Sequence, residues 1–377
     1  MKPIKSLAGV AAFAVALGIA GGAYAAKEVR VTIGVGPKHP VATDGWPTHV
    51  KSVEAETKGS VKYKLFVGGA LLDIKATLNG VRDGVADAGL YAFTYWPAEL
   101  PLGNLIGDFA MLGEDPQTMA AATTEFTLLH CPECQAELRP YRTVYTGTYS
   151  TTPYRIISKG RIASLEDIKG KKLRTAGGAW VRWSQKIGAV SVSLPAPEMY
   201  EGISTGVIDG AIQTTAALQG YGLWDVAKDI TLIPLGTYHA LSLFGYNSGV
   251  WKDFTAAERR AILNGAADGI AATVARYYEQ DATVLKEATE KGVQVHQPGK
   301  DLAEATRAFA LGDLDVIVAE AVEKRKITNA RAIADKMSEL MQKWEKLSAP
   351  VREDQAGYAA LLKRELFDKI DVKTYGM

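Results

Sequence analysis

Residues 167–213 read DIKGKKLRTAGGAWVRWSQKIGAVSVSLPAPEMYEGISTGVIDGAIQ, and this stretch decides the fold. It opens with an expected strand (KKLRT), a glycine turn and an expected helix (AWVRWSQKI), followed by a glycine stop and a second strand (SVSLP). This order predicts a βαβ unit. Ligands of open α/β sheets bind outside the carboxyl ends of the strands, and Arg174 is predicted to lie at such an end. Gly177 and Gly178 would let a ligand approach the backbone.

Arg174 has the chemistry of an anion anchor. Its planar guanidinium can donate two parallel hydrogen bonds to a carboxylate, sulfonate or phosphate, and it keeps its charge. The amides that begin the next helix add positive potential at the same place. The alternative is that Arg174 pairs with a carboxylate of its own fold, and the spacing taken alone favours that alternative.

The chain shows two patterns, an alternation of elements and an internal repeat. Strand-like and helix-like stretches alternate between residues 27 and 84, which predicts α/β architecture with parallel sheets. GVRDGVADAG (80–89) and GISTGVIDGA (202–211) each place a helix-ending glycine before a short strand. The repetition predicts two similar α/β lobes. Asp87 and Asp209 at matching places are interpreted as turn and cap residues.

A long helix is predicted after these lobes. TAAE at residues 255–258 forms a capping box, and the helical pattern continues to Lys291 before Gly292. At 1.5 Å per residue such a helix reaches on the order of 50 Å, enough to lie across both lobes. The segment 301–377 is also predicted to be helix-rich, with KMSELMQKWEKL as its clearest amphipathic piece.

The N-terminal 25 residues are predicted to be a cleavable signal peptide. Lys2 and Lys5 precede an apolar run from Leu7 to Ala20, and AYA at 23–25 offers a small-residue cleavage site. The run is shorter than the roughly 20 residues that a membrane span needs. No cysteine stands at the cleavage point, so no direct lipid anchor is expected. The remaining chain is predicted to be soluble and exported.

The charge balance narrows the classes of partner. The formal net charge is +1 for the whole chain and falls to −1 when the two lysines of the predicted signal peptide are removed. Nucleic acids and anionic membranes both need a basic protein surface, so neither is expected as a partner.

The two cysteines, Cys131 and Cys134, stand in the sequence HCPEC. A zinc site would need a second ligand pair, which the scattered histidines do not supply. In an oxidising compartment a local disulfide is the preferred interpretation, and a redox role is the alternative. No metal site and no cofactor are predicted.

Four longer segments carry a family resemblance: VGGALLDIKATLNGVRDGVADAG (67–89), SLEDIKGKKLRTAGG (164–178), LPAPEMYEGISTGVIDGAI (194–212) and YNSGVWKDFTAAERRAI (246–262). Together they resemble the solute-binding subunit of tripartite ATP-independent periplasmic (TRAP) transporters, the DctP family. The resemblance covers nearly all of the chain after residue 25.

The resemblance implies a two-lobed periplasmic binding protein fold of the α/β class, with hinge-crossing segments and a long helix that spans the lobes. The implied division is residues 26–151 plus 239–279 for lobe I, 152–238 plus 280–340 for lobe II, and 341–377 for a C-terminal helical extension.

The family's ligand contacts can be carried over to this sequence. The arginine of the KLR motif falls on Arg174, and a family asparagine falls on Gln213, which is still an amide. One strand earlier, where some members have a second arginine, the matching position is Tyr154 or Arg155. Neighbouring strand residues face opposite sides, so only one of these two is expected to reach the ligand. Gly177 is expected beside the ligand in the turn after Arg174.

Aromatic residues complete the expected site. Tyr91 and Tyr95 follow the first lobe's short strand, and Trp180 begins the helix after Arg174, although Trp180 would also suit the core. His39 lies on a loop that lines the cleft in the family, with a loop-fixing role as the alternative. One strong cation among aromatic rings suggests a monoacid with an apolar or stackable body. The positions that contact sialic acid in some members hold other residues here, which argues against sialic acid.

The resemblance implies a periplasmic receptor that binds a small organic anion, closes around it, and delivers it to the small and large TRAP membrane subunits. No catalytic residues are predicted. One alternative is a secreted α/β enzyme acting on a similar acid, although no GxSxG, HExxH or Walker sequence occurs. Another is a sensor that presents its closed form to a signalling receptor.

Overall fold

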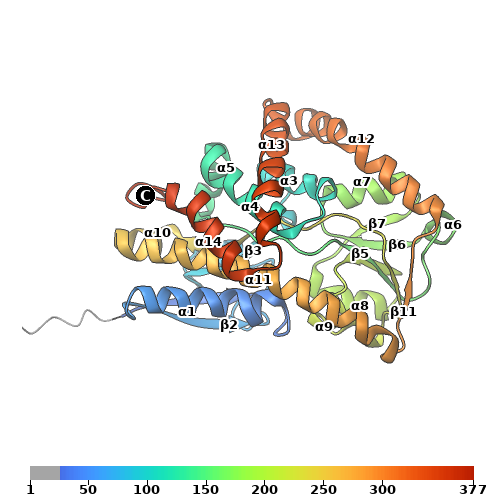
Figure 1. The fold of residues 1–377 in the computed structure, drawn as a ribbon, viewed down its shortest axis with the longest axis horizontal. Coiled ribbons are helices and arrows are strands. Elements are labelled where there is room, and N and C mark those ends of the chain that lie inside the picture. The colour runs from blue at the N-terminus through green and yellow to red at the C-terminus, as the bar shows by residue number, and fades with distance from the viewer. Residues whose placement is uncertain (1–25) are drawn as a thin grey trace, which may run out of the picture.

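The computed structural model describes residues 26–377, so the predicted signal peptide lies outside the described residues. The chain forms two lobes, each built on one β-sheet (Figure 1). The first sheet has the strand order β2 (Val61–Val67), β1 (Lys27–Ile33), β3 (Ala88–Ala92), β10 (Leu241–Asn247) and β4 (Thr143–Val144). The second has the order β11 (Gln294–His296), β9 (Asp229–Thr231), β5 (Arg155–Ser158), β8 (Gly210–Gln213), β6 (Lys172–Thr175) and β7 (Val190–Ser193).

Both sheets are mixed, which corrects the expectation of parallel sheets. In each sheet the strands joined by helices run parallel, as β1–β3 and β6–β8 do. The exceptions are β10 and β5, which run antiparallel to both of their neighbours. Each of these two strands follows a segment that crosses between the lobes, residues 232–240 before β10 and residues 145–154 before β5. The returning chain therefore enters the sheet from the opposite end.

The βαβ unit predicted from residues 171–195 is confirmed as β6, α7 (Gly178–Lys186) and β7. Its two strands pair in parallel, with Arg174 opposite Val192. Arg174 is thus the third residue of the four-residue strand β6, next to its carboxyl end.

The internal repeat has the same geometry in both lobes. Gly84 and Gly206 both take left-handed backbone angles, with φ of 77° and 75°. Asp87 then accepts the backbone amide of Arg30 at 2.8 Å, and Asp209 accepts that of Lys172 at 2.8 Å. Each aspartate fixes the neighbouring strand at the end of the sheet far from the other lobe.

Helix α11 (Ala256–Glu290) begins at the predicted capping box, in which Thr255 and Glu258 bond each other's backbone amides. It packs against α1 (Trp46–Glu56) and α14 (Gln355–Glu365) in the first lobe and reaches β11 in the second. Figure 1 shows it running from one lobe to the other. The predicted helix that spans the lobes is confirmed.

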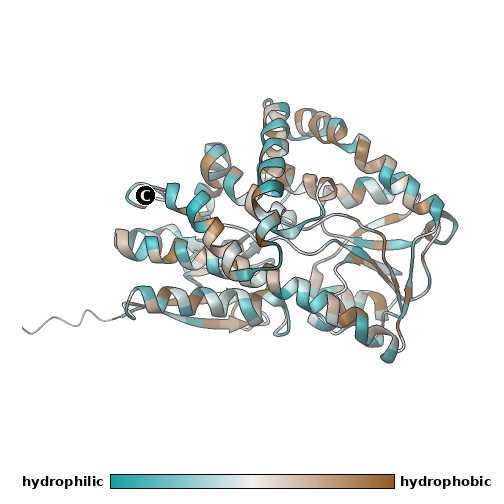
Figure 2. Cartoon of the chain, in the orientation of Figure 1, coloured by the Kyte–Doolittle hydropathy of each residue, from teal (hydrophilic) through white to brown (hydrophobic). Residues whose placement is uncertain are grey.

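The C-terminal region is helical, as predicted. Helix α12 (Lys300–Arg325) passes from the second lobe towards the first, and α13 (Ala330–Ser348) packs on α4 (Pro116–Glu125). These outer helices alternate hydrophilic and hydrophobic stretches along their length (Figure 2). The remaining helices are α2 (Thr77–Arg82), α3 (Pro101–Asp108), α5 (Pro132–Leu138), α6 (Leu165–Ile168), α8 (Met199–Ser204), α9 (Ala217–Gly220) and α10 (Ser248–Asp253).

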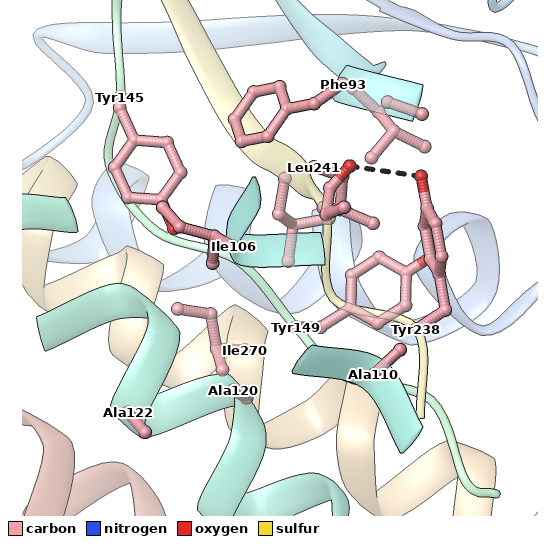
Figure 3. Close-up of a cluster of buried hydrophobic side chains, with 14 of the residues drawn as sticks. Phe93, Ile106, Ala110, Ala120, Ala122, Tyr145, Tyr149, Tyr238, Leu241 and Ile270 are labelled. Carbon is pink, nitrogen blue, oxygen red and sulfur yellow. Dashed lines mark hydrogen bonds between the residues drawn. The ribbon is translucent and has the colours of Figure 1, made fainter. Parts of the chain in front are cut away.

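A large apolar core lies under the first sheet and continues between the lobes. Figure 3 shows part of it, with Ile106 of α3, Leu241 of β10 and Ile270 of α11 drawn together. Tyr149 and Tyr238 join this cluster from the two crossing segments. The same two tyrosines reach the space between the sheets, so the core supports the site directly.

Cys131 and Cys134 form the predicted local disulfide at the start of α5. None of the helices within residues 26–377 has both the length and the apolar character of a membrane span. Across the same residues no group of three or more histidine, cysteine, aspartate or glutamate side chains is arranged to hold a metal ion.

Candidate functional site

A cavity of about 40 Å³ lies between the two sheets. Val35 follows β1, Ala92 ends β3 and Gln213 ends β8, so the cavity lies at the carboxyl ends of strands from both lobes. This is where ligands of open α/β sheets bind. The cavity is lined by Val35, His39, Ile74, Leu90, Ala92, Tyr95, Tyr149, Thr151, Tyr154, Arg174, Ala176, Ala196, Gln213, Tyr221, Tyr238, Leu241 and Tyr277.

Arg174 is the one residue of this lining with a permanent charge. Its side chain is buried, with 2% of the residue exposed. Nε donates to the carbonyl oxygen of Leu194 at 2.8 Å, whereas the buried Nη1 has no hydrogen-bond partner. None of the lining residues is acidic. The guanidinium is therefore held in place through Nε, and its outer face is left without a counter-charge from the cavity wall.

Six tyrosines surround this charge. On one side Tyr154, Trp180 and Tyr238 form a cluster in which Tyr154 stacks on Trp180 at 4.7 Å and on Tyr238 at 6.2 Å, measured between ring centroids. On another side Tyr149 stacks on Tyr277 at 5.6 Å. Burial raises the pKa of Tyr149, Tyr154, Tyr221, Tyr238 and Tyr277 above the ordinary range, so these hydroxyl groups stay neutral. The wall offers aromatic faces and neutral hydroxyl groups.

His39 is neutral and has a defined tautomer. Its Nδ1 accepts the backbone amide of Val41 at 3.2 Å, and burial lowers its pKa to about 3. The proton therefore belongs on Nε2, which lies 3.0 Å from the hydroxyl of Tyr277 and donates to it. The hydroxyl of Tyr277 can then donate its own proton, and the hydroxyl of Tyr149 is a neighbouring acceptor. His39 adds no charge to the cavity at neutral pH.

Gln213 contributes a donor. Its Oε1 accepts the backbone amide of Thr214 at 2.9 Å, which fixes the orientation of the side-chain amide. The NH₂ group is then the part of Gln213 that can bond a ligand oxygen.

Tyr95 joins the lobes across the cavity. It lies in a short 3₁₀ turn after β3, and its hydroxyl oxygen accepts the backbone amide of Ala196 at 3.2 Å. Ala196 follows β7 in the second sheet. The bond leaves the hydroxyl proton of Tyr95 available to an acceptor in the cavity.

Of the nine residues predicted to bind ligand, the structure brings together Arg174, Gln213, Tyr154, Tyr95 and His39. The other four do not line this cavity, so their direct contact with a ligand stays a prediction. Tyr91 lies between Leu90 and Ala92, which both line the cavity, so its side chain points to the opposite face of β3 and into the core. Arg155 follows Tyr154 and likewise faces the other way.

Arg155, Trp180 and Gly177 have other environments. Burial lowers the pKa of Arg155, and the carboxylate of Asp281 on α11 partly offsets this. Trp180 lies behind Tyr154 and donates from Nε1 to the carbonyl of Leu235 at 2.7 Å. Gly177 lies against Thr94 of the other lobe. These residues support the cavity wall and do not form it.

Four of the cavity tyrosines were not predicted: Tyr149, Tyr221, Tyr238 and Tyr277. Tyr149 and Thr151 are two residues apart on an extended crossing segment, and this spacing could have predicted that both side chains face the same side. Tyr277 stands beside Tyr278 on a long and mostly buried helix, where the sequence does not say which ring reaches a cleft.

Two larger hollows lie elsewhere. One of about 590 Å³ adjoins β4 and the C-terminal residues, and one of about 530 Å³ lies beside α12. The smaller cavity is the candidate ligand site, because it combines strand ends of both sheets with a buried cation that no carboxylate in its wall neutralises.

Comparisons with known proteins identify the family and the fold. The family model DctP, described as bacterial extracellular solute-binding protein, family 7, matches residues 35–315. A TRAP solute-binding protein from a marine metagenome, solved with 3-hydroxybenzoate, superposes with a TM-score of 0.76 at 19% identity, covering 85% of this chain and 100% of that chain. One from Rhodoferax ferrireducens, solved with benzoate, gives 0.75 at 17%, covering 85% and 99%. One from Bordetella bronchiseptica, solved with mandelate, gives 0.71 at 20%, covering 84% and 99%.

Curated relatives match in part. A solute-binding protein from Albidiferax ferrireducens is 26% identical over 190 residues, which is 49% of this chain and 54% of that protein. A 2,3-diketo-L-gulonate-binding periplasmic protein from Escherichia coli is 25% identical over 193 residues, 50% of this chain and 56% of that protein. The match thus spans about half the length of these relatives.

Proposed function

The chain belongs to the bacterial extracellular solute-binding protein family 7, and we propose that it captures a small organic monoanion between its lobes and delivers it to the membrane subunits of a TRAP transporter. In this role it would act in the periplasm. Its partners would be the small and large integral membrane components of the transporter.

The proposal rests on the buried charge of Arg174, which has no counter-charge in the cavity wall. A buried ion without a partner costs several kcal/mol, and a protein normally neutralises it with a carboxylate. Arg174 is buried, its Nη1 has no partner, and no acidic residue lines the cavity. An anionic ligand would supply the missing charge and two charge-assisted hydrogen bonds.

The wall supports a ligand with a single ionised group. A carboxylate on Arg174 would meet its counter-charge, whereas a second carboxylate would face neutral His39 and tyrosine hydroxyl groups. The stacked rings of Tyr154 and Tyr238 suit a flat or apolar body. The relatives solved with benzoate and mandelate hold ligands of this chemistry. We favour an aromatic or other apolar monocarboxylate, with a sulfonate as the alternative head group.

We also propose binding without turnover, in preference to a secreted enzyme. His39 is held between the Val41 amide and Tyr277, and burial keeps it neutral, so it has little capacity as a general acid near pH 7. The cavity wall supplies no carboxylate to act as a base.

The test is a thermal-shift screen of benzoate, mandelate, benzenesulfonate and succinate, followed by calorimetry on the hits. A ligand present at 100 times its Kd stabilises the folded protein by about 2.7 kcal/mol. We expect the aromatic monoanions to raise the melting temperature and succinate to have no effect. Mass spectrometry after prolonged incubation should recover the ligand unchanged. A product, or a shift with succinate alone, would contradict the proposal.

A further inference from the structure

Beside the cavity the two lobes meet backbone to backbone. A Cβ atom built on Gly36, in the loop after β1, would lie 2.7 Å from the carbonyl oxygen of Gly220, the last residue of α9. The φ angle of Gly36 is not positive, so no left-handed backbone demands a glycine there. The missing side chain instead permits the close approach of the lobes.

Gln280 of α11 ties the two segments that make this contact. It is 1% exposed, and its Nε2 donates to the carbonyl oxygen of Lys38 at 3.2 Å and to Oε1 of Gln219 at 2.7 Å. Lys38 belongs to the loop after β1 of the first sheet, and Gln219 belongs to α9, which follows β8 of the second sheet. One amide group thus holds a segment of each lobe. Moving the lobes apart must break at least one of its two bonds.

The contact adjoins the cavity on both sides. Three residues before Gln280, Tyr277 bonds His39, the residue after Lys38. Tyr221, which follows Gly220, packs edge-on against His39 with centroids 5.6 Å apart. His39, Tyr221 and Tyr277 line the cavity, whereas Gln280 and Gly36 do not.

We propose that Gln280 and the Gly36–Gly220 contact form an inter-lobe joint that stabilises the closed arrangement and thereby sets ligand affinity without touching the ligand. Gln280 is a positioning residue in this joint. The effect on affinity rests on the proposed capture of a ligand between the lobes, but closure itself can be measured with no ligand present.

An ion pair provides the measurement. Lys75 Nζ lies 3.5 Å from Glu198 Oε1, and these side chains, 57% and 52% exposed, come from different lobes. A carbodiimide adds to the glutamate carboxyl group, and a lysine amine in contact with it then forms the amide and releases the carbodiimide as a urea, so the cross-linked peptide is lighter by one water. Lys62 and Glu54, 2.9 Å apart within the first lobe, serve as the internal reference. The ratio of the two cross-linked peptides, measured by mass spectrometry, reports the closed population.

Gly36→Ala places a methyl group against the Gly220 carbonyl, and overpacking of this kind should lower the ratio by about fivefold or more. Gln280→Leu removes both bridging bonds at similar volume and should lower it by about fivefold. Gly312→Ala is the matched control, because a Cβ there meets nothing within 4 Å, and its ratio should equal that of the wild type.

Ratios equal to wild type in both joint variants would overturn the inference. If Gly36→Ala does not fold, the cross-link ratio of Gln280→Leu alone tests the inference. The result also distinguishes the inter-lobe joint from the proposed function. If the protein binds no organic acid but both joint variants lower the cross-link ratio, the proposed function is wrong and the joint is supported. If the protein binds benzoate but the ratios are unchanged, the proposed function is supported and the joint is wrong.

Discussion

Two arginines near the start of α7 differ in their surroundings: Arg182, whose side chain is 9% exposed, lies within the helix, and Arg174 is buried on the preceding strand. Arg182 donates from Nε and Nη2 to both carboxylate oxygens of Asp313 at 2.8 Å, and from Nη1 to Asp108 at 3.1 Å. Asp108 also accepts from Arg325 at 2.6 Å. Arg174, on the preceding strand, has a single bond from Nε to a backbone carbonyl. The first arginine is neutralised by its own fold, and the second is not.

The difference separates a structural cation from a ligand anchor. Both residues stand in one βαβ unit, and both are arginines that a sequence pattern could assign to an anion. Arg182 joins α7 to α3 and α12, which pins the second lobe to the first and to the C-terminal helices. Arg174 lines a cavity, and its buried Nη1 has no hydrogen-bond partner. The location of the acidic side chains, more than burial, decides which role each arginine has.

The largest effect on stability is expected for Arg182→Met. It leaves Asp313 and Asp108 buried with fewer partners, and breaking a buried pair in this way costs about 3 to 5 kcal/mol of unfolding free energy. Denaturant titration measures it. Arg331→Met is the control, because its pair with Asp315 is largely exposed, and its unfolding midpoint should equal that of the wild type. Equal losses in the two variants would remove the contrast.

Arg174→Met should lower the affinity for ligand and leave the stability unchanged. We expect affinity for benzoate to fall by about 2 to 5 kcal/mol, or about 30-fold to several-thousand-fold, with no loss of stability because a buried unpaired charge is removed. Calorimetry and thermal unfolding give the two numbers. Arg155→Met, which lies off the cavity wall, should keep wild-type affinity. Binding that survives in the Arg174 variant and disappears in the Arg155 variant would move the anchor to Arg155.

Acid should affect stability and binding differently. Burial lowers the pKa of His39 and His49 to about 3 and that of His239 to about 4, below the unfolded value of 6.5. Above pH 6.5 these groups are neutral in both the folded and the unfolded state, whereas below pH 6.5 the unfolded state binds protons more readily. Each group then lowers the free energy of unfolding by up to about 1.4 kcal/mol per pH unit as the pH falls towards its folded pKa. Denaturant titration at several pH values measures this loss.

Affinity for benzoate should meanwhile stay constant between about pH 5.5 and 8, because His39 gains no charge in that window. Calorimetry at several pH values tests this. An affinity that rises as the pH passes down through 6.5 would mean that His39 becomes a second cation of the site.

The smallest effect is expected for Tyr154→Phe, which removes one hydroxyl group from the cavity wall and keeps the ring that stacks on Trp180. A lost hydrogen bond to ligand should weaken benzoate binding by about 1 kcal/mol, or about fivefold. Tyr91→Phe is the matched control and should bind as wild type, because Tyr91 faces the core. Equal weakening in both variants would point to a general disturbance of the first lobe.

The sequence predicted the elements of the fold better than the composition of the site. The matched glycines Gly84 and Gly206 and the capping box at Thr255 are local signals, and local structure followed them. Arg174 stands next to the carboxyl end of a strand in a recognisable βαβ unit, but its assignment to a ligand came from the family resemblance, because the spacing alone favoured a partner within the fold. The sequence did not predict that both sheets are mixed. The direction of β5 and β10 in their sheets depends on how the chain crosses between the lobes, which no local signal shows.

The aromatic wall depended on contacts between distant segments. Tyr149, Tyr221, Tyr238 and Tyr277 come from two crossing segments, the end of a short helix and a long helix, and meet only when the lobes are together. Spacing within one segment could indicate at most the face on which Tyr149 lies, not that the four rings meet. Strand alternation did resolve one local question, because it allowed only one of Tyr154 and Arg155 to face the cavity, and Tyr154 is the residue that does.

The strand order also dictates when each lobe can be completed as the polypeptide emerges from a ribosome or an export channel. The first sheet needs β10, at residues 241–247, to fill the place between β3 and β4. Before that segment is out, β3 has an open edge and β4 has no neighbour, while much of the second sheet has already been delivered. The central strands of the second lobe can therefore pair before those of the first lobe, although the first lobe begins the chain. The first sheet cannot be completed until β10 is available, which disfavours early folding of the N-terminal half.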